Sequence, residues 1–307
     1  MTLAILLAVV AGLLALSGRV PWIGLAMMAG GGVTAILGDG MVSLAGFGGA
    51  LGGAVWMAAD HRRAVATWAG LAALLGAAGV GLGDALTVAG AAVLMGVAPM
   101  HVVMMPVSAT ESGKAVRTLG RILGVAMLLT VTFELRPSWW PVLLALGAAG
   151  LIWGGRGALD RSAKWMDGAA LASTSLCALC LGIGAIEAAT WLLIAVSLAE
   201  AGAVLAETAG SKRAVGLAAA LTFGGLLPLG WRGWAEGLTA IADAGLWILG
   251  LIGALSWLIL AWRSVTQIAT IQAGLTLNTP PRRLQVAMGV ALILLVGLGL
   301  LPVEMLP

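Results

Sequence analysis

The sequence predicts an all-α polytopic membrane protein with about 12 transmembrane helices, forming a single transmembrane domain over residues 1–307. Of its 307 residues, 61% are hydrophobic and only 9% are charged, whereas soluble domains carry roughly 25% charged residues. The 46 glycines suit membrane helices, which pack closely through small residues. Prolines also interrupt two of the apolar segments, as they do in transporter helices.

Twelve apolar segments account for nearly the whole chain. The connections between them are short, and the longest, from Arg263 to Arg283, is only moderately polar. No separate soluble domain fits into any connection. The predicted spans are 2–17, 21–38, 41–59, 64–82, 84–105, 115–134, 137–155, 165–185, 187–208, 213–230, 238–262 and 284–303.

The basic residues alternate between the two sides of these spans. Fourteen of the 16 lysines and arginines lie in or near odd-numbered connections, and only Arg136 and Arg232 lie in even-numbered ones. The positive-inside rule then makes the odd connections cytoplasmic. We therefore expect a multi-pass protein of the inner (cytoplasmic) membrane with both termini on the outer side.

Tryptophan is the expected interfacial anchor, because the chain has 13 tryptophans and no tyrosine. Seven tryptophans lie near predicted span ends: Trp22, Trp139, Trp140, Trp165, Trp231, Trp234 and Trp262.

Pro99 and Pro228 are the clearest breaks in apolar spans, and each follows glycine within a few residues. A proline removes a helical hydrogen bond, which a membrane tolerates only where protein or water replaces it. The two spans are five apart and cross in opposite senses, which indicates two inverted five-helix repeats, about 21–134 and about 137–262, flanked by helices 2–17 and 284–303. Paired interrupted helices point to a transport site, although two independent packing kinks would give the same pattern.

Several ionisable residues are candidates for moving protons. Glu200 lies near the middle of an apolar span, where a charge is costly; it is either a relay group or a neutral carboxyl hydrogen-bonded between helices. Lys114 and Arg117 share one helical side with Arg121, and they either line a half-channel or snorkel to the interface as topology determinants. His101 follows the first break and is a proton relay or a structural histidine.

Cofactor chemistry has no motif in this sequence, so no cofactor and no metal site are expected. Cys177 and Cys180 lie one turn apart in an apolar span and fit the role of small packing residues. No nucleic-acid partner is indicated, since the net charge of +3 comes from short connections.

Four motifs resemble the antiporter-like subunit family, which includes the proton-pumping membrane subunits of respiratory complex I, the large Mrp antiporter subunits and relatives in energy-converting hydrogenases. They cover about residues 84–263. The motifs are Ala98-Pro99-Met100-His101 with Pro106, the helix from Arg117 to Leu128 with Gly124, Ala163-Lys164-Trp165 with 170–176, and Gly225-Leu226-Leu227-Pro228-Leu229-Gly230-Trp231. The resemblance implies two inverted repeats with a broken helix in each, and it adds Lys164 to the proton-path candidates.

The chain departs from the family at most proton-handling positions. The lysine expected before the first break falls on Leu94, and the lysine after the second break falls near Trp234 or Ala235. The resemblance therefore implies a shortened, degenerate member. It would be a subunit of a complex I-like or Mrp-like assembly that takes part in proton or sodium translocation, or a scaffold for pumping subunits.

The implied partners are other antiporter-like and small membrane subunits, peripheral redox subunits and lipid. The resemblance leaves open whether the chain is a non-catalytic membrane subunit of a redox-driven proton-translocating oxidoreductase related to NADH-quinone oxidoreductase. A stand-alone secondary transporter for a small solute, with its site between Pro99 and Pro228, is the alternative, and a plain membrane anchor is a third reading.

Overall fold

The computed structural model describes residues 1–82, 84–99, 101–104, 110–132, 136–159, 165–209, 214–273 and 280–301. Within them the chain is built of helices and short connections, with no strand. Two compact units divide these residues: unit 1 takes 1–96 and 101–132, and unit 2 takes 97–99 and 136–301.

Unit 1 holds seven α-helices among its described residues. Glycines are frequent in its second and third helices, whose backbones approach each other closely. The helices are α1 (Thr2–Ser17), α2 (Trp22–Leu37), α3 (Gly40–Met57), α4 (Arg62–Leu82), α5 (Asp84–Met95), α6 (His101–Met104) and α7 (Glu111–Thr132), with a 3-10 turn η1 (Ala59–His61) before α4.

Helices α2 and α3 form an antiparallel pair whose backbones touch through glycine. A methyl group at Gly31 would lie 2.5 Å from the Ala50 backbone nitrogen and 2.6 Å from the Gly46 carbonyl oxygen. The same crowding recurs two turns away, where a methyl group at Gly53 would lie 2.5 Å from the Met28 nitrogen. Small residues thus set the distance between these helices, as expected for membrane helix pairs.

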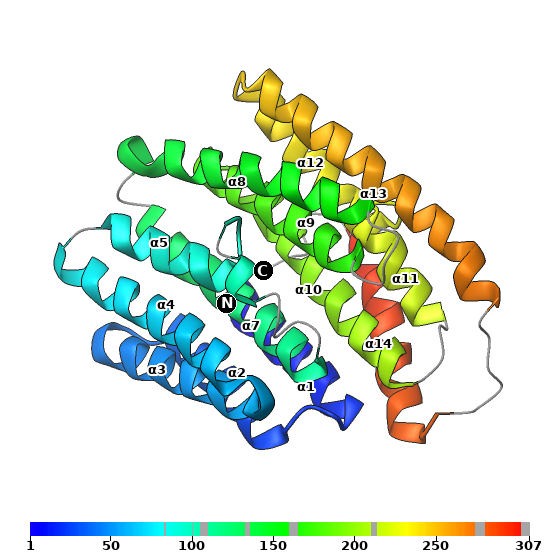
Figure 1. Cartoon of the computed structure of the whole chain (residues 1–307), viewed down its shortest axis with the longest axis horizontal. Helices are drawn as coiled ribbons and strands as arrows, with labels where there is room; N and C mark the ends of the chain where they lie inside the picture. The colour runs from blue at the N-terminus through cyan, green and yellow to red at the C-terminus, as the bar shows by residue number, and fades with distance from the viewer. Residues whose placement is uncertain are drawn as a thin grey trace. The chain divides into compact units, whose positions relative to one another are not determined.

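Helix α5 packs between α4 and α7, and Figure 1 shows α4 and α5 side by side in cyan. Gly90 of α5 faces the Ala72 carbonyl of α4, with 3.1 Å between that oxygen and a would-be methyl group. A methyl group on Gly124 of α7 would likewise lie 2.8 Å from the Ala91 carbonyl oxygen of α5. The first broken helix is therefore held on both sides by glycine contacts.

Unit 2 is built in the same way from longer helices. They are α8 (Arg136–Leu159), α9 (Trp165–Gly182), α10 (Ile186–Thr208), α11 (Ala214–Phe223), α12 (Pro228–Asp243), α13 (Trp247–Ala273) and α14 (Arg282–Gly297), followed by a 3-10 turn η3 (Leu298–Leu300). Helices α8 and α9 pair through Gly154 and Gly168, where a methyl group on Gly154 would lie 2.6 Å from the Ala172 nitrogen.

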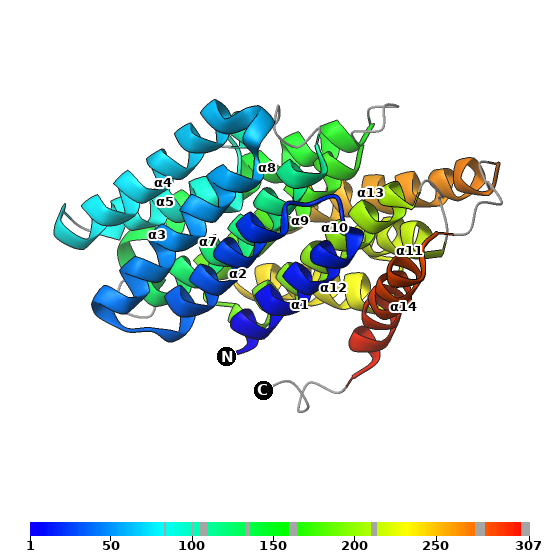
Figure 2. The same ribbon diagram turned by 90° about the horizontal axis from the view of Figure 1, so that it is seen from below.

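Helix α10 is the core of unit 2. It packs against α9, α11, α12 and α14, and residues 191–206 along it are all buried. Figure 2 shows α11 between α13 and α14, which enclose it from two sides. The outer faces of α13 and α14 are apolar and exposed, as in Leu251, Leu258 and Ile293, which suits contact with lipid.

The helix order confirms an all-α polytopic membrane protein. By length and composition, seven helices of the described chain can cross a membrane, and the broken pair α11–α12 counts as one of them. Shorter apolar helices include Thr2–Ser17, Trp22–Leu37 and Ala85–Met95. When each broken helix is counted as one span, the helices follow the predicted spans in order.

The predicted boundary between the tenth and eleventh spans is wrong. The sequence placed Arg232 in a connection, but it lies inside α12, and the connection falls at residues 244–246. A charged residue between two apolar segments, such as Arg232, predicts a connection. The charge is tolerated inside the helix because the arginine Nε donates to the Glu236 carboxylate at 2.8 Å.

Two of the tryptophans predicted to be interfacial anchors are instead core residues. Trp165 and Trp234 are 2% and 1% exposed, so they pack inside unit 2 and do not face lipid headgroups. Trp165 meets Phe223 edge to face, with ring centroids 6.5 Å apart. A position near a span end therefore does not separate an anchor from a core tryptophan.

Candidate functional site

The first half of the second broken helix, α11, ends in a Schellman cap. Gly225 has φ 65°, which favours glycine, and its nitrogen donates to the Thr222 carbonyl at 3.0 Å. The Leu226 nitrogen donates to the Leu221 carbonyl at 2.8 Å, which completes the motif. Pro228 then begins α12 at its first turn, where a missing N–H costs nothing.

The first broken helix ends in a similar way. Gly96 has φ 66°, and its nitrogen donates to the Val93 carbonyl at 3.2 Å. In both breaks proline stands three residues after the left-handed glycine, as Pro99 after Gly96 and as Pro228 after Gly225. The structure thus confirms the two breaks and shows that glycine ends the first half-helix while proline precedes or starts the second.

Glu200 lies on the most buried helix of unit 2 and is 4% exposed. Its position along α10 relative to the break follows from two neighbouring contacts. A methyl group on Gly202 would lie 3.5 Å from Ala219 of α11, and one on Gly233 of α12 would lie 3.2 Å from the Leu192 backbone. Since α11 ends and α12 begins between these two levels, Glu200 lies within about one helical turn of the second break.

Three basic residues of unit 1, Lys114, Arg117 and Arg121, line one side of α7. Lys114 and Arg117 are half-buried, and Arg121, one turn further on, is 3% exposed. His101 begins α6, is half-buried and belongs to the same unit, in which α6 packs against α4. Burial thus increases along α7, so Arg121 is a core residue and not a snorkelling side chain.

The candidate residues are divided between the two units. His101, Lys114 and Arg117 belong to unit 1, and Glu200 belongs to unit 2. Lys164 lies outside the described residues. A continuous polar axis through all of them stays a prediction.

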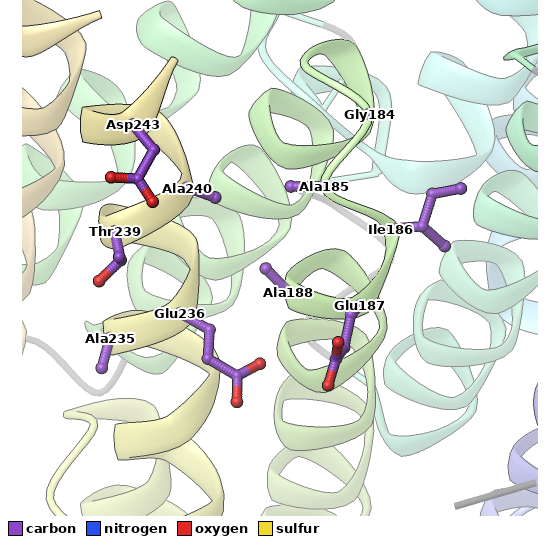
Figure 3. A pocket seen from close by; sticks show the side chains of 10 residues that line it. All are labelled: Gly184, Ala185, Ile186, Glu187, Ala188, Ala235, Glu236, Thr239, Ala240 and Asp243. Carbon is purple, nitrogen blue, oxygen red and sulfur yellow. The ribbon is translucent and has the colours of Figure 1, made fainter. Parts of the chain in front are cut away.

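A groove opens between α12 and the turn that leads into α10, with a volume of about 700 Å³. Glu187 of α10 and Glu236 of α12 line this groove from opposing helices, with Ala188 between them and with Ala185 and Ala240 further along it (Figure 3). Asp243 and Thr239 also line it. Among the residues that the structure describes, no three His, Cys, Asp or Glu side chains come together as metal ligands.

Arg232 joins α12 to two other parts of unit 2. Its guanidinium lies 3.9 Å from the ring centroid of Trp191 in α10, and Nη1 donates to the Leu301 carbonyl at 2.7 Å. Gly299 of η3 sits directly against the Leu229 backbone, so a side chain there would collide with α12. The η3 turn is thereby fixed onto the start of the second half-helix.

Sequence reasoning missed Trp68 and Trp257. The Trp68 Nε1 donates to the Val93 carbonyl at 2.8 Å, and the Trp257 Nε1 donates to the Gly224 carbonyl at 3.0 Å. Both acceptors lie at the ends of the broken helices. The available signal was a tryptophan inside an apolar span, where its N–H needs a partner.

Comparison with known proteins identifies the fold. A chain of the Mrp complex from Dietzia sp. DQ12-45-1b aligns over 91% of this chain and 67% of its own length, with a TM-score of 0.72 and 14% identity. A chain of respiratory complex I from Thermus thermophilus with bound aureothin aligns over 98% of this chain and 84% of its own length, with a TM-score of 0.77 and 19% identity.

A chain of the same complex with bound NADH aligns over 95% of this chain and 79% of its own length, with a TM-score of 0.70 and 18% identity. No protein-family model matches the sequence, and no curated protein matches it. The matches show that this chain shares its fold with these chains of the Mrp complex and of respiratory complex I, which is the fold that the sequence motifs implied.

Proposed function

We propose that this chain, with its antiporter-like fold, is a membrane subunit of a complex I-like or Mrp-like ion-translocating assembly. The observation that carries the proposal is a structural match over 91–98% of the chain, with both broken helices present. Its partners would be other antiporter-like and small membrane subunits. We place it in the inner membrane with both termini outside, because the basic residues favour that orientation.

Within this assembly we propose a scaffold role. The resemblance places a lysine at Leu94, which is 1% exposed in the last turn of α5 before the first break. A buried leucine neither carries nor attracts a proton. Glu200, Arg117, Lys114 and His101 are the residues through which protons would pass if this copy conducted.

The test is purification of the native protein in mild detergent, with mass spectrometry of the proteins that accompany it. Co-purification with other antiporter-like subunits, or with iron–sulfur or hydrogenase-type subunits, supports the proposal. A clean monomer or homo-oligomer would overturn it and favour a stand-alone solute transporter, which liposome uptake by the purified chain would then examine.

Glu200→Gln and Arg117→Ala are expected to change ion translocation by the whole assembly by less than about twofold, the range of neutral substitutions. The reason is that a scaffold does not route protons through these side chains. Ion flux in vesicles that contain the assembly measures this. A loss of about a hundredfold, typical of a removed proton-transfer group, would show that this copy conducts and that the scaffold role is wrong.

A further inference from the structure

Each broken helix exposes a carbonyl end inside the membrane-spanning region. Such an end carries a partial negative charge and orphan acceptors. In transporters, the C-terminal ends of half-helices coordinate the transported cation. The partners of these carbonyl groups therefore indicate whether a break is available to a cation.

At the second break four carbonyl groups accept hydrogen bonds from the protein itself, those of Ala220, Leu221, Thr222 and Gly224. Ala220 accepts from the Gly224 nitrogen at 3.1 Å and from the Ser264 hydroxyl at 2.8 Å. Leu221 and Thr222 accept from the Schellman cap. The Gly224 carbonyl, the first one beyond the helix, accepts from the Trp257 indole.

The Trp257 indole of α13 packs against two residues next to the second break, Gly225 and Trp231. Gly225 provides room for it, since a methyl group there would collide with Nε1. Trp231 of α12 meets its ring edge to face, with centroids 5.1 Å apart. The donor, carried by α13, is thus held against the break by the connection before α12 and by α12 itself.

At the first break the donor is Trp68 of α4, which is fully buried. Its ring lies against Gly120 of α7, where a methyl group would approach to 2.7 Å. Trp68 comes from the helix before the broken one, whereas Trp257 comes from the helix after it. At both breaks an indole N–H thus binds a carbonyl group, but the tryptophan comes from a different position in the fold.

We infer that Trp68 and Trp257 close both breaks to protons and cations. An indole N–H is a neutral donor with no acceptor lone pair and no titration near physiological pH. It occupies the Val93 carbonyl at the first break and the Gly224 carbonyl at the second, so neither group is left to coordinate a cation, and an indole offers no lone pair to carry a proton onward. The inference rests on the proposed function and makes this chain an insulating member of an ion-translocating assembly.

The test uses the purified full chain in proteoliposomes with a potassium diffusion potential and an internal pH dye. Wild-type vesicles are expected to leak protons no faster than protein-free vesicles. Trp257→Phe and Trp68→Phe, which keep an aromatic ring and remove the donor, are expected to raise proton flux by about tenfold, the factor equivalent to one hydrogen bond. Trp234→Phe is the matched control, because it replaces a buried tryptophan beside the second break whose indole is not the donor to Gly224.

Wild-type vesicles that already conduct would overturn the inference, whether or not the variants fold. Two folded phenylalanine variants as tight as wild type would overturn it as well, and so would an equal increase in the Trp234→Phe control. Failure here is separable from failure of the proposed function. Co-purification with antiporter-like subunits can hold while the wild-type chain conducts, and the flux result stands even if the chain purifies alone.

Discussion

Gly31→Ala is expected to destabilise the protein by about 3 kcal/mol, because the added methyl group has no space between α2 and α3. It would lie 2.5 Å from the Ala50 nitrogen and 2.6 Å from the Gly46 carbonyl oxygen. Both are backbone atoms and cannot rotate away, so the two helices must separate along their length. The loss is measured as a lower unfolding midpoint in detergent, by thermal or denaturant titration.

Gly30→Ala is the matched control, one position away in the same helix. No described atom lies within 4 Å of a methyl group at Gly30. Alanine is the better helix former by about 1 kcal/mol, so this variant is expected to be as stable as wild type or slightly more stable. Equal midpoints for the two variants would show that α2 and α3 are not packed backbone to backbone.

The second large effect is expected at the second break. Gly225→Ala should cost about 3 kcal/mol, since alanine at φ 65° is strained and its methyl group displaces the Trp257 indole. Gly96→Ala has nearly the same φ of 66°, but no described atom lies within 4 Å of the new methyl group. Its cost is therefore expected to be the backbone term alone, about 1 kcal/mol.

The difference between these two variants isolates the contribution of the indole. Unfolding midpoints of both proteins, together with tryptophan emission of Gly225→Ala, give the comparison. A red-shifted emission is expected for Gly225→Ala, because the new methyl group displaces the Trp257 ring from its packing against Trp231. If Gly96→Ala were the more destabilised of the two, crowding at Trp257 would not be what constrains Gly225.

Much of the architecture could be predicted from the sequence because it depends on local signals. Long apolar segments must become helices in a membrane, since no water is present to satisfy their backbone groups. Proline and glycine signals are equally local, so the sequence predicts both breaks, at Pro99 and Pro228. The position of Glu200 inside an apolar span likewise makes it a candidate without any structure.

Arg232 shows where local signals fail. A charged residue between apolar segments predicts a connection, but here the guanidinium is satisfied by Trp191, Glu236 and the Leu301 carbonyl. Trp191 and Leu301 are distant in sequence, so only the packing of α10, α12 and η3 makes a helix through this position favourable. The same reason explains why the eleventh span begins later than predicted.

Hydropathy, proline and glycine act within a few residues, so the helical class, the order of the spans and the positions of both breaks follow from the amino-acid sequence. Which donors meet the carbonyl groups at those breaks depends on how the helices pack. Trp68 and Trp257 lie 25 and 33 residues from the carbonyl groups they bind, and their donors meet those acceptors only after the helices pack. Partners for orphan backbone groups are chosen by proximity in space, which no spacing along the chain encodes.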